Sequence, residues 1–452
     1  MKIRYLPDSF IEEEGKDLLG FNEFAKSTLA AIRYSEPPFT WGIYGDWGSG
    51  KTSLMKLIKG RMETDLKNPE PGSQDALHIP VWFNAWEYEN ELNIIYPLFY
   101  AIYRDFSARC KGAQNKKAFS ESFKKVALGS LFGLTDLALR TVTKAAIGEA
   151  LKLDDVKKAL EMVEENLQTV FSKWTDQVTE TKQAFEEFVN NYLNIYRGLH
   201  PEIGNRELYL AIFVDDLDRC LPDVAIQILE RIKNHLTVDK CIFVLGVNRN
   251  VVYKSIQKKY GDLDIDGRQH LEKIIQYSVG VPEPSDQAIK EFGKKSLSAL
   301  VISKNTKALE KYFDEFSETL WVTGFTNPRK IKRILNRYLN FIARHTSLDK
   351  NDKDYIDNYD RAAITRLIIL REYYQDFYCL FEEGDFAALR EIADYDGKQQ
   401  SQEQFIVNHG KKWDSLLPRF DRMKKIVAVS KNLKREKSDY LRVLGQLFGM
   451  ED

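Results

Sequence analysis

The sequence has few cysteines and histidines, and neither type is spaced as a metal site or a disulfide framework. The six histidines form no HExxH motif. The four cysteines form no CxxC pair and lie far apart, at Cys110, Cys220, Cys241 and Cys379. Zinc sites and disulfide-stapled folds need closely spaced ligands or paired cysteines. This pattern argues against both and favours a reducing compartment.

The chain also has almost no net charge. Its 66 Lys and Arg residues offset 67 Asp and Glu residues, which leaves −1, so no global field favours nucleic acid or an anionic membrane. Hydrophobic content of 43% and charged content of 29% are typical of a soluble globular protein. A length of 452 residues is enough for two or three domains.

Long uninterrupted apolar runs are missing. The first residues, Met1–Asp8, lack the apolar core of a secretory signal. The best membrane candidate, Val126–Val142, contains Asp136 and Arg140 on one helical face. Because a bilayer span needs about 20 mostly uncharged apolar residues, we expect a buried or interfacial helix here and no membrane span. The expected location is the cytoplasm, with peripheral membrane association left open.

Five short apolar runs rich in β-branched or aromatic residues predict buried strands. They are Phe39–Tyr44, Ile79–Asn84, Leu208–Val214, Cys241–Val247 and Tyr277–Val281. Helical patterns separate them, which is the rhythm of an α/β fold with a parallel sheet covered on both faces. The first run leads into a glycine-rich loop, and a helix is expected over Thr52–Lys59.

The uneven spacing of these strands predicts the domain organisation. The long interval between the second and third strands is rich in Lys, Glu, Ala and Leu and predicts a large helical insertion. No strand is expected after about residue 285, where stretches such as Arg361–Glu382 and Arg419–Leu447 predict helices. The expected parts are a core (1–88 and 207–285), the insertion (89–206), a helical lid-like subdomain (286–350) and a helical C-terminal domain (351–452).

The glycine-rich loop matches the phosphate-binding pattern GxxxxGK[ST]. Its residues are Gly45, Asp46, Trp47, Gly48, Ser49, Gly50, Lys51 and Thr52, followed by Ser53. A strand precedes the loop and a helix follows, so backbone N–H groups and the helix N-terminus can face phosphates. We expect the lysine to reach the β- and γ-phosphates and the threonine hydroxyl to ligate Mg²⁺. The loop predicts a nucleoside triphosphate site for ATP or GTP.

Paired acids follow the third predicted strand, in the run Asp215-Asp216-Leu217-Asp218-Arg219. We expect Asp215 to hold Mg²⁺ and Asp216 to polarise a water for attack on the γ-phosphate. A bound cation also relieves the repulsion between adjacent carboxylates. The alternative is a solvated acidic turn at a strand end.

Two further polar residues are candidates for contacts with the γ-phosphate region. Asn248 follows the fourth strand and could orient the attacking water, although it could also cap the helix that follows. Arg329 lies in the first turn of a helix that begins Asn327-Pro328. A cation opposes the helix dipole at that position unless an anion lies nearby, which favours a phosphate contact. A solvated basic face is the alternative.

These motifs together resemble the KAP family of P-loop NTPases over most of residues 15–340. The resemblance rests on Trp41–Thr52, Val81–Tyr88, Asp215–Arg219, His270–Ile275 and Asn327–Arg329. It implies an additional-strand core related to AAA+ and STAND ATPases, with strand order 5-1-4-3-2, and a bacterial antiphage setting. Relatives often carry membrane helices in the insertion and an Asp after the fourth strand, where this chain has a polar insertion and Asn248. The cluster Trp82, Phe83, Trp86 and Tyr88 is expected to lie in the core.

The resemblance also implies a homo-oligomer in which a neighbouring subunit completes the site. The candidates for such a trans-acting cation are Arg219, Arg268 and Lys273. Three functions stay open. The first is a regulatory ATP-hydrolysing switch that controls a protein partner. The second is a nucleic-acid-stimulated ATPase, suggested by the basic stretch Arg419–Arg442. The third is a small-molecule kinase, although no acceptor-binding lid is recognisable.

Overall fold

The chain divides into two units, each described by itself. The computed structural model describes residues 2–3, 5–7, 17, 19–90, 95–111, 117, 119–124, 174–260, 266–302, 314–320, 326–346, 360–396, 398–409, 420–427 and 436–448. Asn22–Val281 belongs to the sheet unit. The helical unit contains Pro282–Asp452 together with Met1–Phe10 and Lys16–Phe21.

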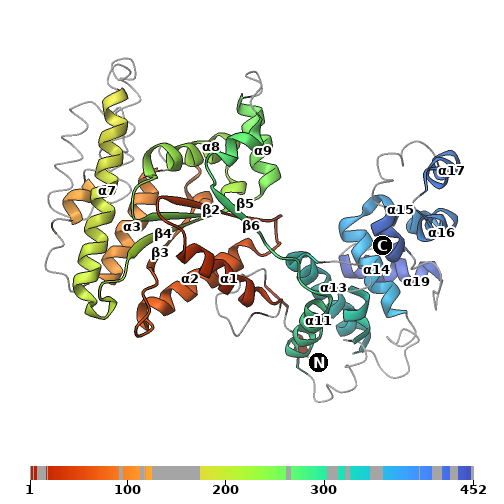
Figure 1. The fold of residues 1–452 in the computed structure, drawn as a ribbon. Coiled ribbons are helices and arrows are strands. Elements are labelled where there is room, and N and C mark those ends of the chain that lie inside the picture. The colour runs from red at the N-terminus through yellow and green to blue at the C-terminus, as the bar shows by residue number, and fades with distance from the viewer. Residues whose placement is uncertain are drawn as a thin grey trace. The chain divides into compact units, whose positions relative to one another are not determined.

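A five-stranded parallel sheet forms the centre of the sheet unit (Figure 1). Its strands are β2 (Phe39–Tyr44), β3 (Leu77–Asn84), β4 (Leu208–Asp215), β5 (Cys241–Val247) and β6 (Tyr277–Gly280). Their order is β3-β4-β5-β2-β6, which is the predicted 5-1-4-3-2 order read from the other edge. The α/β fold class and the strand order are therefore confirmed.

Helices cover both faces of this sheet, as the apolar strands require. In Figure 1, α1 and α2 lie on one side of the sheet, and α8 and α9 lie on the other. Every residue of β5 is buried, so this strand has no solvated face. The helices of the unit are α1 (Phe21–Arg33), α2 (Lys51–Lys67), α3 (Ile95–Arg109), α7 (Trp174–Leu199), α8 (Pro222–Arg231), α9 (Arg249–Tyr260) and α10 (Gly267–Glu272). Single turns occur at Ala85–Tyr88, Pro201–Ile203, Leu217–Arg219 and, as a π-helical turn, Ile232–Leu236.

Two helices of the insertion, α3 and α7, are described, and an aromatic core lies between them. Phe106 stacks on Phe119 with ring centroids 3.6 Å apart, and Tyr192 meets Phe106 edge-on at 5.2 Å. All three side chains are almost fully buried. The predicted helical character of the insertion is confirmed for these helices, while the membrane candidate Val126–Val142 lies outside the described residues. Within the part of the chain that the structure describes, no helix is long and apolar enough to cross a bilayer.

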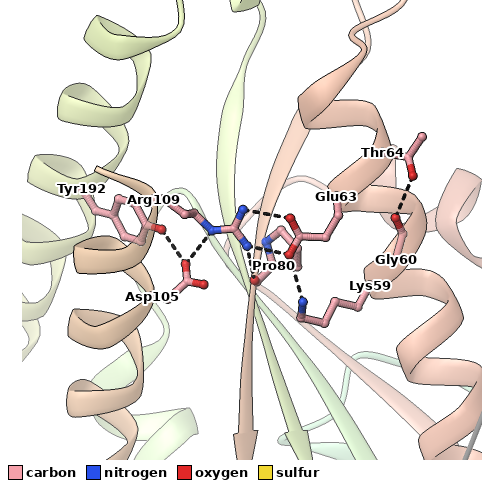
Figure 2. A network of polar contacts seen from close by, with 8 residues as sticks. All are labelled: Lys59, Gly60, Glu63, Thr64, Pro80, Asp105, Arg109 and Tyr192. Carbon is pink, nitrogen blue, oxygen red and sulfur yellow. Dashed lines mark hydrogen bonds and ion pairs between the residues drawn. The ribbon is translucent and has the colours of Figure 1, made fainter. Parts of the chain in front are cut away.

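A polar network joins the insertion to α2 (Figure 2). Arg109, at the end of α3, donates to both carboxylate oxygens of Glu63 on α2, at 2.8 and 2.6 Å. Its Nε donates to Asp105 at 2.9 Å, and the Tyr192 hydroxyl of α7 donates to the same carboxylate at 2.5 Å. Lys59 Nζ donates to Glu63 at 2.9 Å. Bidentate guanidinium–carboxylate pairs are strong and geometrically specific, so the network fixes both insertion helices to α2.

Among its described residues, the helical unit contains helices of 8 to 19 residues and a two-residue strand pair. The helices are α11 (Asp286–Leu300), α13 (Pro328–Thr346), α14 (Arg361–Tyr373), α15 (Gln375–Glu383), α16 (Phe386–Ala393), α17 (Gln399–His409), α18 (Phe420–Val427) and α19 (Lys437–Phe448). β1 (Lys2–Ile3) pairs antiparallel with β7 (Val301–Ile302). The expectation of no strand after about residue 285 is therefore wrong. Two residues are too few to show an alternating pattern, and the pairing partner, Lys2–Ile3, lies far away in the sequence.

Two predicted helices differ in their bounds. α2 continues to Lys67 and does not end at Lys59. The stretch Arg361–Glu382 is broken at Tyr374, whose φ of −142° and ψ of 58° leave the helical region. Neither Gly nor Pro stands at this break, so the sequence carries no stop signal there. The proposed domain boundaries at residues 88, 206, 285 and 350 stay predictions.

The Glu63 carboxylate gives the network a defined pH dependence. Burial alone raises its pKa, but hydrogen bonds from Arg109 and Lys59 outweigh burial and lower the pKa from 4.5 to about 2. A carboxylate with a lowered folded-state pKa contributes stability above its unfolded pKa, and that contribution disappears as the pH falls toward the folded pKa. We expect Glu63→Gln to lower the free energy of unfolding by about 2 kcal/mol at pH 7. The deficit should shrink between pH 4.5 and 2.

Urea unfolding of both proteins at pH 7, 4 and 3 measures this deficit. Glu121→Gln is the control, because Glu121 is half-exposed and pairs with Lys124 at 3.1 Å within one helix, and exposed pairs contribute little. A deficit for Glu63→Gln that stayed constant over this pH range would contradict the assigned role of the carboxylate.

Candidate functional site

The glycine-rich loop connects β2 to α2 at the carboxyl edge of the sheet. Gly48 and Gly50 have φ values of 78° and 108°, in the left-handed region that favours glycine. Ser49 N–H donates to the Asp46 carbonyl at 3.1 Å and closes the turn. α2 begins at Lys51, directly after Gly50. The first N–H groups of a helix have no partner within the helix, so the loop and the helix start present backbone donors to an anion.

Lys51 is buried and its ammonium group points back onto the loop. Nζ lies 2.8 Å from the Gly45 carbonyl oxygen and 3.3 Å from that of Asp46. It also lies 3.3 Å from Asp218 Oδ2, and the two side chains are only 8% and 2% exposed. The structure therefore brings the predicted lysine to the acidic run after β4, which is far away in the sequence.

Asp215 is the last residue of β4 and faces the start of α2. Its carboxylate is almost fully buried and accepts a hydrogen bond from the Thr52 side chain. Burial, followed by the neighbouring Asp216, raises the pKa of Asp215 from 3.8 to about 6. Its Oδ1 has no hydrogen-bond partner among the described residues. A cation stabilises a buried carboxylate oxygen that has no hydrogen-bond partner.

These residues fit a magnesium ion held together with phosphates. Mg²⁺ takes one or two protein oxygen ligands, and substrate phosphates and waters supply the others. The Thr52 hydroxyl and the unpartnered Asp215 Oδ1 are such ligands. No group of three or more His, Cys, Asp or Glu side chains that could hold a metal ion occurs within the described ranges.

Asp216 lies beside the site but its carboxylate is already paired. The residue has a left-handed φ of 58°, which Asp and Asn tolerate better than most residues. Its Oδ1 lies 2.8 Å from Arg219 Nε. The predicted polarising carboxylate and the predicted trans-acting Arg219 therefore contact each other within one chain.

Asn248 caps the following helix, which is one of the two roles that the sequence left open, while its role in orienting a water stays a prediction. Its Oδ1 accepts hydrogen bonds from the N–H groups of Asn250 and Val251, at 3.1 and 3.3 Å, so it caps α9. Its Nδ2 donates to Asp46 Oδ1 in the loop at 3.3 Å. The cap fixes the side chain so that its amide group faces the phosphate loop.

Three other cations were predicted to act at the site. Two of them lie in or just after α10, and the third lies in the helical unit. Arg268 is exposed near the start of α10, with its guanidinium 5.7 Å from the Tyr253 ring centroid, and Lys273 is exposed just after this helix. Arg329 belongs to the helical unit and lies in the first turn of α13, where Asn327 Oδ1 accepts a hydrogen bond from Lys330 N–H at 3.2 Å. Its contact with a phosphate stays a prediction.

Sequence reasoning missed two residues and placed one incorrectly. Asp218 received no role, although its position three residues after the strand end was a usable signal. Gly246 was not singled out, yet a Cβ there would lie 2.8 Å from Asp215 Oδ1 and 2.7 Å from Met55 Sδ. Trp86 was expected in the core but is 45% exposed, with Arg219 5.2 Å from its ring centroid. Trp86 follows the end of β3, where the chain leaves the buried sheet.

The loop, its lysine and the acid at the end of β4 define a P-loop nucleoside triphosphatase fold. A model described as the KAP family P-loop domain matches residues 21–344, so the chain belongs to the KAP family. The Phage T7 exclusion protein of Escherichia coli (strain K12) is 23% identical over 283 residues, or 61% of this chain. The match covers only 35% of that protein's length.

Solved structures that align with this chain include two Aeropyrum pernix proteins. The ORC2 protein, in ADPNP and ADP complexes, aligns over 99% of this chain and 96% of its own with 13% identity and a TM-score of 0.34. The ORC1 protein, in complex with DNA, aligns over 97% and 94% with 12% identity and a TM-score of 0.32.

The close contact at Gly246 makes a test of the Asp215 position. We expect Gly246→Ala to displace both Met55 and the Asp215 carboxylate, because the added Cβ would lie 2.7 and 2.8 Å from them, and buried overpacking typically costs about 1–3 kcal/mol. Affinity for ATP with Mg²⁺ should fall roughly tenfold, which corresponds to about 1.4 kcal/mol. Gly198→Ala in α7 is the control, since nothing lies within 4 Å of a Cβ there. Titration calorimetry with unchanged affinity for Gly246→Ala would contradict the assignment of Asp215.

Proposed function

We propose that this chain binds ATP with Mg²⁺, hydrolyses it, and uses the hydrolytic cycle to control a protein partner. The observation that supports ATP binding most directly is the meeting of Lys51, Thr52 and Asp215 at one sheet edge, where Asp215 keeps an unpartnered buried oxygen. The backbone N–H groups of the loop and Lys51 can bind phosphates, and the Asp215 carboxylate can bind the accompanying Mg²⁺.

Each residue has a defined part in the proposed reaction. The N–H groups from Gly48 to Thr52 and the Lys51 ammonium bind the β- and γ-phosphates, and Thr52 and Asp215 hold Mg²⁺, which neutralises the charge on those phosphates. Asp216 accepts a proton from the attacking water, which requires its carboxylate to exchange the Arg219 contact for that water. Asn248 orients the water through its amide.

The proposed setting is bacterial antiphage defence. It is supported by family membership and by the likeness to a protein named for phage exclusion. Since this chain spans about a third of that relative, the effector activity is proposed to lie in a partner or in parts that the match does not cover. A homo-oligomer is proposed as the active form, with Arg268 or Lys273 of one subunit completing the site of the next.

Two substitutions separate binding from hydrolysis. Lys51→Ala removes the cation for the phosphates, so nucleotide binding should be lost. Asp216→Asn keeps the left-handed backbone, because Asn adopts φ of about 60° readily. It should therefore bind ATP normally while turnover falls by roughly 10²-fold or more, the range typical of a lost general base. Equilibrium binding and phosphate release measure the two effects. Normal ATP affinity in Lys51→Ala would refute the site.

Purification with the products of neighbouring genes tests the proposed partner. We expect a stable complex whose ATP turnover differs from that of the chain alone and rises with protein concentration, because neighbouring subunits complete the site. Native mass measurement reports the oligomer. Turnover that instead rises with added DNA and falls steeply with salt would favour the nucleic-acid function. Phosphate appearing on a small acceptor would favour a kinase.

A further inference from the structure

Asp218 occupies a position that the proposed reaction does not use. It lies in the short turn Leu217–Arg219 after β4, and its side chain is 2% exposed. Two features hold this turn: Leu217 is fully buried, and Asp216 pairs with Arg219 across it at 2.8 Å. The turn directs the Asp218 carboxylate to Lys51 Nζ, 3.3 Å away.

The Lys51 ammonium is fully satisfied by the chain itself. An ammonium group has three donors, and Nζ has three oxygen partners: the carbonyls of Gly45 and Asp46 and the carboxylate of Asp218. A phosphate that binds this lysine must therefore displace at least one of these partners or share the cation with it. Asp218 is the charged member of the three and makes the strongest type of contact.

We propose that Asp218 is a positioning residue that competes with phosphate for Lys51 and thereby sets the affinity of the loop for nucleoside di- and triphosphates. The proposal rests on the proposed nucleotide site and adds a regulating residue to it. Opposite charges this close attract each other in a buried site, so the carboxylate offsets part of the attraction of Lys51 for an anion.

Neutral substitution of Asp218 should tighten binding selectively. We expect Asp218→Asn to bind ADP and ATP roughly tenfold more tightly than the wild type, because the competing charge is gone. AMP has no β-phosphate and should keep its affinity, since Lys51 reaches only the β- and γ-phosphates. A purely structural role for Asp218 would not separate ADP from AMP.

Competition of ADP and AMP against a fluorescent ADP analogue measures these affinities, on the full chain with Mg²⁺. Asp223→Asn is the control, because Asp223 is an exposed acid in the first turn of α8; its ADP affinity should equal that of the wild type. Asp218→Ser is a second neutral variant with the same expected direction, and Asp218→Glu keeps the charge and should stay close to the wild type. Circular dichroism reports the folding of each.

The outcomes distinguish the two proposals. Tighter ADP binding in a neutral variant, with AMP and Asp223→Asn unchanged, supports competition by Asp218. Unchanged or weaker ADP binding in a folded neutral variant overturns it, while the nucleotide site stands. Failure of both neutral variants to fold, when Asp218→Glu folds, overturns it in favour of a structural role. A wild-type chain that binds no ADP refutes the proposed function itself, and the competition falls with it.

Discussion

The parallel pairing of β5 with both β4 and β2 is the constraint on which the site depends. Parallel strands end at the same edge of a sheet, so the residues after β2, β4 and β5 come together there although they lie far apart in the chain. Lys51 and Asp218 are separated by 167 positions and yet form a buried ion pair. The long insertion between β3 and β4 does not disturb this arrangement, because β3 and β4 pair along their whole length.

Three carboxylates lie within four residues at this edge, and the fold separates them by giving each a different partner. Asp215 faces Thr52, Asp216 contacts Arg219, and Asp218 contacts Lys51. Neighbouring carboxylates repel each other in a buried site. Arg219 and Lys51 neutralise Asp216 and Asp218 within the chain, so Asp215 stays available for a cation.

α2 connects this site with the insertion. Its first residue is Lys51, and about two and three turns later Lys59 and Glu63 contribute to the network that holds α3 and α7. A helix is a stiff element, and packed interfaces shift as units. The phosphate loop and the insertion are thus attached to opposite ends of one rigid segment. In the proposed switch, this attachment lets the insertion follow the nucleotide, and Arg109 of α3 makes its contact with Glu63 of α2.

The strand runs, the phosphate loop and the acid after β4 were predictable from the sequence, because they depend on local patterns: apolar runs, glycine spacing and an acid at a strand end. The strand order came from the family resemblance. The partners of these residues could be found only in the folded structure. The Asp216–Arg219 pair, the role of Asp218, the close approach at Gly246 and the exposure of Trp86 depend on which side chains meet across strands and turns. The β1–β7 pair likewise joins two segments that lie far apart in the sequence, Lys2–Ile3 and Val301–Ile302. A linear pattern carries no record of such contacts, since burial and charge compensation arise only when distant segments pack together.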